Sequence, residues 1–240
     1  MESSEKCRIS VCMPTYNGAA YIKRQVETIL AQLGEQDELV VSDDSSSDDT
    51  LSILASFADD RIRLLTGNQF RSPIYNLENA LVHAKGEYIF LTDQDDVWLS
   101  NKVEVVLEAL KTNDLVVTDC SVVDSHEQVV VDSFYSIMNS GCGFWKNLYK
   151  NTYMGCCMAF RSSVLDYALP FPKRIPMHDS WIALSVEYKG GNIVFLEDKC
   201  LLYRRHGKNA STCSSSSSQT LKKKFVDRLY LLTSIIRKYK

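Results

Sequence analysis

Short apolar runs alternate with helix-periodic segments along the first half of the chain. The runs are four to six residues long, as in buried strands, whereas the segments between them repeat apolar residues every three or four positions, as in amphipathic helices. The predicted strands lie at 8–13, 38–42, 62–66, 88–91 and 115–118. The predicted helices lie at 19–33, 48–57, 74–84 and 101–110. Repeated strand–helix units favour an α/β fold with a doubly wound, mainly parallel sheet.

The second half of the chain has a less regular pattern, typical of a smaller mixed region. A hairpin-like excursion is predicted at 121–132, and a loop of small and aromatic residues at 141–150. Further strands are predicted at 154–161, 193–196 and 199–203, and helices at 162–169 and 179–188. We therefore expect one domain over 1–213 with halves that meet near 120, a serine-rich linker at 214–219, and a C-terminal helix at 220–240.

Composition narrows the class of protein. The chain has 240 residues, is 45% hydrophobic and 24% charged, and carries a formal net charge of −3. These values are typical of a globular protein and give no support for nucleic-acid binding. No apolar run approaches the roughly 18 residues that span a bilayer, and the polar start at 1–6 lacks the apolar segment of a signal peptide. We expect a cytoplasmic protein.

The eight cysteines are interpreted as reduced thiols. They form no CxxC pair and have no histidine at zinc-finger spacing. A cytoplasmic location favours reduced core or surface thiols, and a zinc site is the alternative.

Three polar clusters follow predicted strands. Pro14–Asn17, Asp43–Asp44 and Asp93–Asp95 each begin where an apolar run ends. Ligands of parallel α/β sheets bind beyond the carboxyl ends of the strands, so we expect these clusters to meet at one site.

The acidic run Asp93-Gln94-Asp95-Asp96 carries the strongest chemical signal. Three carboxylates within four positions repel one another, and a cation offsets that repulsion. Mg²⁺ or Mn²⁺ suits few protein oxygens with substrate phosphate completing the shell. Asp95 is the first candidate ligand, with Asp93 and Asp96 in support. A solvated acidic turn that caps a helix is the alternative.

Other polar residues allow both a catalytic and a structural role. Asp43 and Asp44 can accept hydrogen bonds from a ligand or cap the next helix. Asp179, at a predicted helix start, can be a general base or a helix cap. His206 lies in a cationic, glycine-containing stretch that suits a metal or phosphate, together with Arg204, Arg205 and Lys208.

The C-terminal segment 220–240 predicts a basic amphipathic helix. Lysines and arginines alternate with apolar residues at helical spacing. Contact with anionic lipid at the inner membrane face is one interpretation, and packing on the domain or on another subunit is the other.

Taken together, these stretches resemble the family 2 glycosyltransferases, which have the nucleotide-sugar-binding GT-A fold. The matching pieces, in the family's order, are Val11–Gly18, Val41–Thr50, Asn76, Gly86–Ile89, Thr92–Trp98, His178–Asp179 and Tyr203–His206. The ending Asp96-Val97-Trp98 is most similar to rhamnosyltransferase-like members that build bacterial surface polysaccharides. Ser45 departs from the glycine common in the family, and serine fits most turns except those that need positive φ.

The resemblance implies roles for individual residues. The nucleotide pocket would contain Pro14, Thr15, Tyr16, Asn17, Asp43, Asp44 and Asp93. Asp95, Asp93 and His206 would hold Mg²⁺ or Mn²⁺, and Asp179 would be the catalytic base. The candidates for diphosphate or acceptor contacts are Arg204, Arg205, Lys208, Trp98 and His178.

The implied activity is inverting transfer of a sugar from a nucleoside-diphosphate sugar to a hydroxyl of a saccharide or lipid-linked acceptor. The half before about 120 would bind the nucleotide, and 121–213 would face the acceptor. A sugar-phosphate nucleotidyltransferase is a second hypothesis, but it normally has a glycine-rich basic loop where this chain has Pro14–Ala19. A non-catalytic nucleotide-sugar-binding module is a third, and retention of the acidic elements argues against it.

Overall fold

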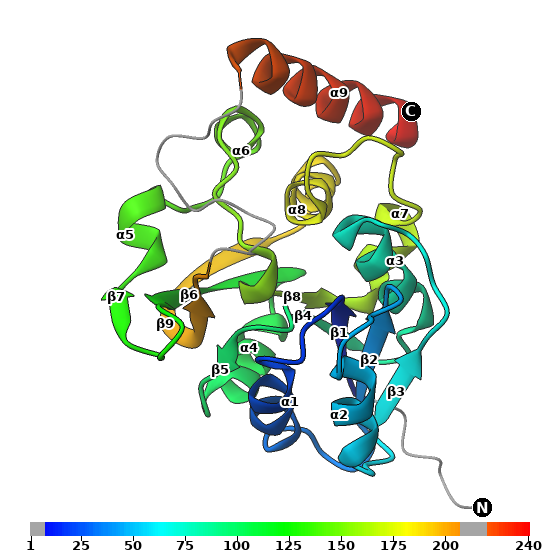
Figure 1. Ribbon diagram of the computed structural model, residues 1–240. Helices are drawn as coiled ribbons and strands as arrows, with labels where there is room; N and C mark the ends of the chain where they lie inside the picture. The colour runs from blue at the N-terminus through cyan, green and yellow to red at the C-terminus, as the bar shows by residue number, and fades with distance from the viewer. Residues whose placement is uncertain (1–7, 207–219) are drawn as a thin grey trace, which may run out of the picture.

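One mixed sheet forms the centre of the computed structural model, which describes residues 8–206 and 220–240 (Figure 1). Its strand order is β3-β2-β1-β4-β8-β6-β9-β5, and β7 pairs with β6. The strands are β1 (Ile9–Thr15), β2 (Glu38–Asp43), β3 (Ile62–Leu65), β4 (Tyr88–Leu91), β5 (Val97–Trp98), β6 (Leu115–Val123), β7 (Val129–Val131), β8 (Met158–Arg161) and β9 (Ile193–Arg204).

The first four strands form the parallel part of the sheet. β1 lies between β2 and β4 and pairs in parallel with both, and β3 pairs in parallel with β2. The side chains of β1, β2 and β4 are almost all buried, since helices cover a parallel sheet on both faces and select continuous apolar runs. The parallel arrangement predicted for these four strands is confirmed.

Helices connect these strands at the predicted places, with ends that differ by a few residues. They are α1 (Ile22–Leu30), α2 (Thr50–Ser56), α3 (Pro73–His83) and α4 (Lys102–Leu110). α1 buries Ile22, Val26 and Ile29, the i, i+4, i+7 stripe that the sequence shows. These helices hold the loops at the carboxyl ends of β1, β2 and β4 in fixed positions.

The second half adds antiparallel pairs to the sheet. β8 lies between β4 and β6 and is antiparallel to both, whereas β9 runs parallel to β6. The sequence predicted two strands at 193–196 and 199–203. They are one strand, β9, because its pairing with β6 shifts register around Glu197 and Asp198 without ending. The predicted strand at 154–161 begins with a 3₁₀ turn, η1 (Gly155–Cys157), and only β8 is extended.

The remaining helices belong to the second half of the chain. They are α5 (Phe134–Met138), α6 (Phe144–Tyr149), α7 (Leu165–Ala168), α8 (His178–Tyr188) and α9 (Leu221–Tyr239), and the short 3₁₀ turn η2 (Ser162–Val164) precedes α7. The prediction of a loop at 141–150 was wrong in part, because α6 forms within that segment. The side-chain amide of Asn147, within this helix, donates to the Gly141 and Gly143 carbonyls just before it.

α9 lies across α6 and α8 (Figure 1). Leu231 and Ile235 are buried against the domain, and the Lys238 ammonium donates to the Pro170 carbonyl at 2.8 Å. Within the described residues, no helix has the length and apolar content needed to cross a membrane. The predicted linker at 214–219 lies outside the described residues, as does Lys208.

Candidate functional site

A cavity of about 1360 Å³ opens at the carboxyl ends of β1, β2 and β4. The N-terminus of α8, the turn η1 and the end of β9 close its other side. Of the expected site residues, those on its wall are Pro14, Thr15, Tyr16, Asn17, Asp44, Asp93, Asp95, His178, Asp179 and His206. The three strand-end clusters therefore meet, as the sequence predicted.

The loop after β1 is tied to both neighbouring strand ends. The Gln94 side chain accepts from the Tyr16 N–H at 3.0 Å and donates to the Tyr16 carbonyl at 3.1 Å. Asn17 has a φ of 48°, and its side-chain oxygen accepts from the Ser47 N–H at 2.8 Å. These paired contacts fix the backbone that forms one wall of the cavity.

Ser45, after β2, has a φ of 61°, in the left-handed region. Serine fits most turns except those that need positive φ, and this turn has positive φ. Serine here is disfavoured relative to glycine by about 1–2 kcal/mol. Its hydroxyl donates to the Asn68 carbonyl at 2.5 Å, which offsets part of that cost.

The two carboxylates after β2 have different surroundings. Asp44 lines the cavity and accepts from the Phe70 N–H at 2.5 Å, so it positions the loop before α3. Asp43 is fully buried and accepts from the hydroxyls of Thr15 and Ser46 and from the Ser46 N–H. The structure does not place Asp43 on the cavity wall, because these neighbours use its carboxylate to hold the turn.

The acidic run after β4 is anchored by Gln25 of α1. The Gln25 amide donates to the Thr92 hydroxyl at 2.6 Å and to the Asp93 carbonyl at 2.9 Å. Burial, together with the negative charges of Asp95 and Asp179, raises the pKa of Asp93 to about 7. Oδ2 of Asp95 lies 2.8 Å from Nε2 of His206, whose ring stacks on Tyr21.

These residues fit a divalent cation. Asp93 and Asp95 bring carboxylate oxygens to one wall of the cavity, beside the imidazole of His206. Burial first, and then its acidic neighbours, raise the pKa of Asp93, and a bound cation would favour its charged form. Oxygen and imidazole donors are a set that Mg²⁺ and Mn²⁺ accept.

Asp96 faces the interior instead of the cavity. It is fully buried, and burial with the charges of Asp95 and Asp93 raises its pKa well above the usual value. Its Oδ2 has no hydrogen-bond partner among the described residues. Donor atoms of Asp93, Asp96 and Cys156 lie within 4.8 Å of one another, so Cys156 joins the edge of the acidic cluster.

Asp179 lies at the start of α8, across the cavity from the acidic run. Burial raises its pKa to about 6, although the Ser180 N–H and the Asn151 amide both donate to its Oδ1. A carboxylate with this pKa is suited to accept a proton near neutral pH. The neighbouring His178 is held neutral, because burial lowers its pKa to about 4.

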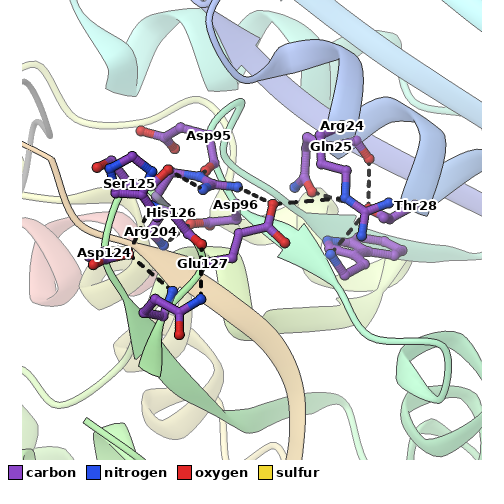
Figure 2. Close-up of polar contacts among 12 residues, drawn as sticks. Arg24, Gln25, Thr28, Asp95, Asp96, Asp124, Ser125, His126, Glu127 and Arg204 are labelled. Atoms are coloured by element: carbon purple, nitrogen blue, oxygen red, sulfur yellow. Dashed lines mark hydrogen bonds and ion pairs between the residues drawn. The ribbon is translucent and has the colours of Figure 1, made fainter. Parts of the chain in front are cut away.

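Arg204 is buried and is not among the residues that line the cavity. Its guanidinium donates to the Asp95 carbonyl at 2.9 Å, the Ser125 carbonyl at 3.2 Å and the Glu127 carboxylate at 2.9 Å (Figure 2). Its backbone N–H donates to Asp96. These partners hold Arg204 between the acidic run and the β6–β7 turn, so its expected contact with diphosphate or acceptor gains no support from the cavity and stays a prediction.

Trp98 and Arg205, two other residues expected to contact diphosphate or acceptor, do not line the cavity either. Trp98 is buried, and its indole N–H donates to the Thr92 hydroxyl at 3.1 Å. It therefore supports the acidic run from behind. Arg205 is exposed, and its backbone N–H donates to the Val123 carbonyl at 2.8 Å.

Comparison with known proteins agrees with this geometry. The family model described as "Glycosyl transferase family 2" matches residues 10–168. The chain belongs to glycosyltransferase family 2. It is thus a glycosyltransferase with the GT-A fold, and its sheet is more mixed than a fully parallel doubly wound sheet.

Relatives of this glycosyltransferase are found among bacterial enzymes. It is 29% identical over 222 residues to the Escherichia coli UDP-Glc:alpha-D-GlcNAc-diphosphoundecaprenol beta-1,3-glucosyltransferase WfgD, covering 90% of this chain and 83% of that protein.

Solved structures share its fold. S. aureus TarS 1–349 in complex with UDP-GlcNAc superposes with a TM-score of 0.69 at 19% identity, covering 96% of this chain and 66% of that one. The Pyrobaculum calidifontis mannosyltransferase PcManGT, in complex with GDP-Man and Mn²⁺, gives 0.64 at 21% identity, covering 98% and 64%. This glycosyltransferase spans just under two thirds of each of these chains.

Several cavity residues escaped the sequence prediction. They include Gln94, Asn151, Tyr153 and Cys156. Gln94 lies inside the acidic run, so its place in the sequence could have predicted that it lines the cavity. The others belong to loops whose path depends on contacts between distant segments.

Proposed function

We propose that this glycosyltransferase moves a sugar from a nucleoside-diphosphate sugar to a hydroxyl of a lipid-linked saccharide, with inversion at the anomeric carbon. The observation that supports it most is the position of Asp179. This buried carboxylate shares one cavity with Asp93 and Asp95, the residues suited to the diphosphate side.

The reaction is a single displacement. The acceptor oxygen forms a bond to the anomeric carbon from the face opposite the diphosphate, and the bond between that carbon and the diphosphate oxygen breaks. Asp179 accepts the hydroxyl proton, and the electron pair of the broken bond leaves with the nucleoside diphosphate. Attack from the opposite face inverts the configuration.

The chain's own residues divide the work of binding. Asp44 and the loop Pro14–Asn17 form the nucleotide side of the cavity. Asp93, Asp95 and His206 would hold Mg²⁺ or Mn²⁺, which when bound neutralises charge on the departing diphosphate. Asn151 orients Asp179 through a hydrogen bond of 3.1 Å.

The substrates are proposed from the relatives. WfgD is named for UDP-glucose and a diphosphoundecaprenol-linked GlcNAc, which supports a UDP-sugar donor and a lipid-linked acceptor here. Rhamnosyl transfer, suggested by the resemblance of the ending Asp96-Val97-Trp98 to rhamnosyltransferase-like members, stays a prediction.

A donor panel tests the proposed function. UDP-glucose, UDP-N-acetylglucosamine, GDP-mannose and dTDP-rhamnose are each incubated with Mn²⁺ and GlcNAc-diphosphate on a short alkyl chain. We expect one donor to release nucleoside diphosphate in step with a glycosylated acceptor. Absence of transfer from every donor, or formation of nucleotide sugar from a nucleoside triphosphate and a sugar phosphate, would contradict it.

A further inference from the structure

An apolar surface remains exposed where α6 meets the first half of α9. It is a groove of about 400 Å³ whose wall includes Trp145, Tyr149, Phe225 and Leu229. These four side chains are between 50% and 70% exposed. A folded monomer seldom leaves so many large apolar groups together in water. We therefore expect this α6–α9 surface to contact a partner.

α9 has two apolar stripes, and only one of them packs on the domain. Leu231 and Ile235 face the domain and are buried, with Tyr239 beyond them donating to the Tyr167 carbonyl at 3.0 Å. Phe225 and Leu229 belong to the other stripe and point into the groove. Burial of Leu231 and Ile235 explains the first stripe, whereas Phe225 and Leu229 stay largely exposed to solvent.

Basic residues are frequent in the two segments that form the groove, and one of them, Arg228, lines it. Residues 144–150 and 221–229 contain six basic side chains, namely Lys146, Lys150, Lys222, Lys223, Lys224 and Arg228, and one acidic side chain, Asp227. The whole chain carries a net charge of −3, so the positive charge of these two segments is local. The Arg228 guanidinium lies 4.2 Å from the centre of the Tyr149 ring, at the groove itself.

We propose that the α6–α9 surface binds an anionic lipid bilayer. Exposed Trp and Tyr rings beside lysines are the chemistry of the membrane–water interface, where an amphipathic helix lies flat with its apolar stripe among the lipid chains. The positive charge of the two segments complements anionic headgroups.

The position of this surface relates it to the active site. α6 and α9 both pack against α8, and α8 carries Asp179 at its N-terminus. Bilayer contact therefore brings the catalytic cavity within one helix of the lipid surface, where an acceptor on a lipid diphosphate would lie. The purpose of the contact rests on the proposed function, whereas the contact itself can be measured without substrate.

Vesicle co-sedimentation of the full chain tests the inference. We expect binding to vesicles of equal parts phosphatidylglycerol and phosphatidylcholine, weakened by salt, and little binding to phosphatidylcholine alone. Trp145→Ser with Phe225→Ser and Leu229→Ser should lower the partition coefficient by about tenfold or more. Lys222→Ser with Lys223→Ser and Lys224→Ser should do the same.

A matched control replaces exposed apolar residues elsewhere. Val82→Ser with Val129→Ser and Val130→Ser changes side chains that are 56–62% exposed on α3 and β7, and it should bind vesicles like the wild type. Equal binding by all variants, or no binding by the wild type, would overturn the inference. A dimer that Trp145→Ser disperses, without vesicle binding, would assign the surface to self-association instead.

Tryptophan fluorescence gives a second measurement that does not depend on a multiple variant folding. Trp98 and Trp181 are buried, and Trp145, the third tryptophan of the chain, is 70% exposed. Anionic vesicles should shift the emission to shorter wavelength, and Trp145→Phe should remove the shift. A shift that survives this substitution contradicts the inference.

The two proposals can fail separately. If the triple variant of Trp145, Phe225 and Leu229 keeps transfer to the short alkyl acceptor and the wild type binds no vesicles, only the lipid inference falls. If vesicles bind but no donor is used, only the proposed function falls.

Discussion

Nε2 of His206, just beyond β9, lies 2.8 Å from Oδ2 of Asp95, just beyond β4. This contact joins two segments that are 111 positions apart in the chain, and it brings an imidazole to the carboxylate expected to hold the cation.

His206→Ala should weaken Mn²⁺ binding in the presence of nucleoside diphosphate by about 10–100-fold, because Asp95 loses the partner that orients it. Calorimetric titration of Mn²⁺ measures the change. His126→Ala, at an exposed histidine on the β6–β7 turn, is the control and should leave affinity unchanged. Equal affinity for both variants would remove His206 from the cation site.

Chelation should weaken donor binding. With EDTA, we expect the Kd of the nucleotide sugar to rise by about tenfold or more, because Asp93 and Asp95 then repel the diphosphate without a cation between them. Added Mg²⁺ or Mn²⁺ should restore it. Undiminished affinity in EDTA would reject the metal role.

Asp179→Asn should lower kcat by about 10²–10⁴-fold, since asparagine cannot accept the acceptor proton. Donor affinity and thermal unfolding should stay close to those of the wild type. Asp166→Asn, at an exposed acid on α7, is the matched control. Wild-type turnover of Asp179→Asn would overturn the assignment of the base.

The rate should fall as the pH falls through about 6, because burial raises the pKa of Asp179 to that value and protonation removes the base. Asn151→Ala deletes a hydrogen bond that favours the charged form. It should therefore move the acid side of the pH–kcat profile to higher pH. An acid side that stays in place in this variant would show that another group controls it.

The two stripes of α9 should differ in their effect on stability. Ile235→Ala should lower the free energy of unfolding by about 2–4 kcal/mol, because Ile235 is fully buried. Leu229→Ala, at a half-exposed position of the same helix, should change it by about 0.5 kcal/mol or less. Urea denaturation compares them, and equal effects would contradict the docking of this helix.

The sequence predicted the parallel half of the fold because each of its strands is a separate apolar run. The same logic could not find α6, whose residues 144–149 follow a stretch with glycines at 141 and 143 and are stabilised by the Asn147 amide. It also split β9, because Glu197 and Asp198 interrupt the apolar pattern at a place where the strand shifts register and continues.

The residue types at the strand ends predicted where the site lies. They did not predict which of those side chains point into the cavity. Asp44 and Asp43 are adjacent, yet one reaches the cavity and the other holds the turn through Thr15 and Ser46. Arg204 and His206 are two positions apart. His206 lines the cavity, whereas the Arg204 guanidinium donates to Ser125 and Glu127 in the β6–β7 turn. Both outcomes depend on contacts between distant segments that no local pattern records.

α8 is buried along all of its first part, from His178 through Val186. A helix enclosed on every side has little freedom to tilt when its neighbours change. We therefore expect the position of Asp179 to be little affected by substitutions in the surrounding loops. The loop at 67–73 and the segment 133–150, which contains α5 and α6, can then vary while the proposed proton acceptor stays in place. We therefore expect substitutions in the surrounding segments to change the choice of substrate without moving Asp179.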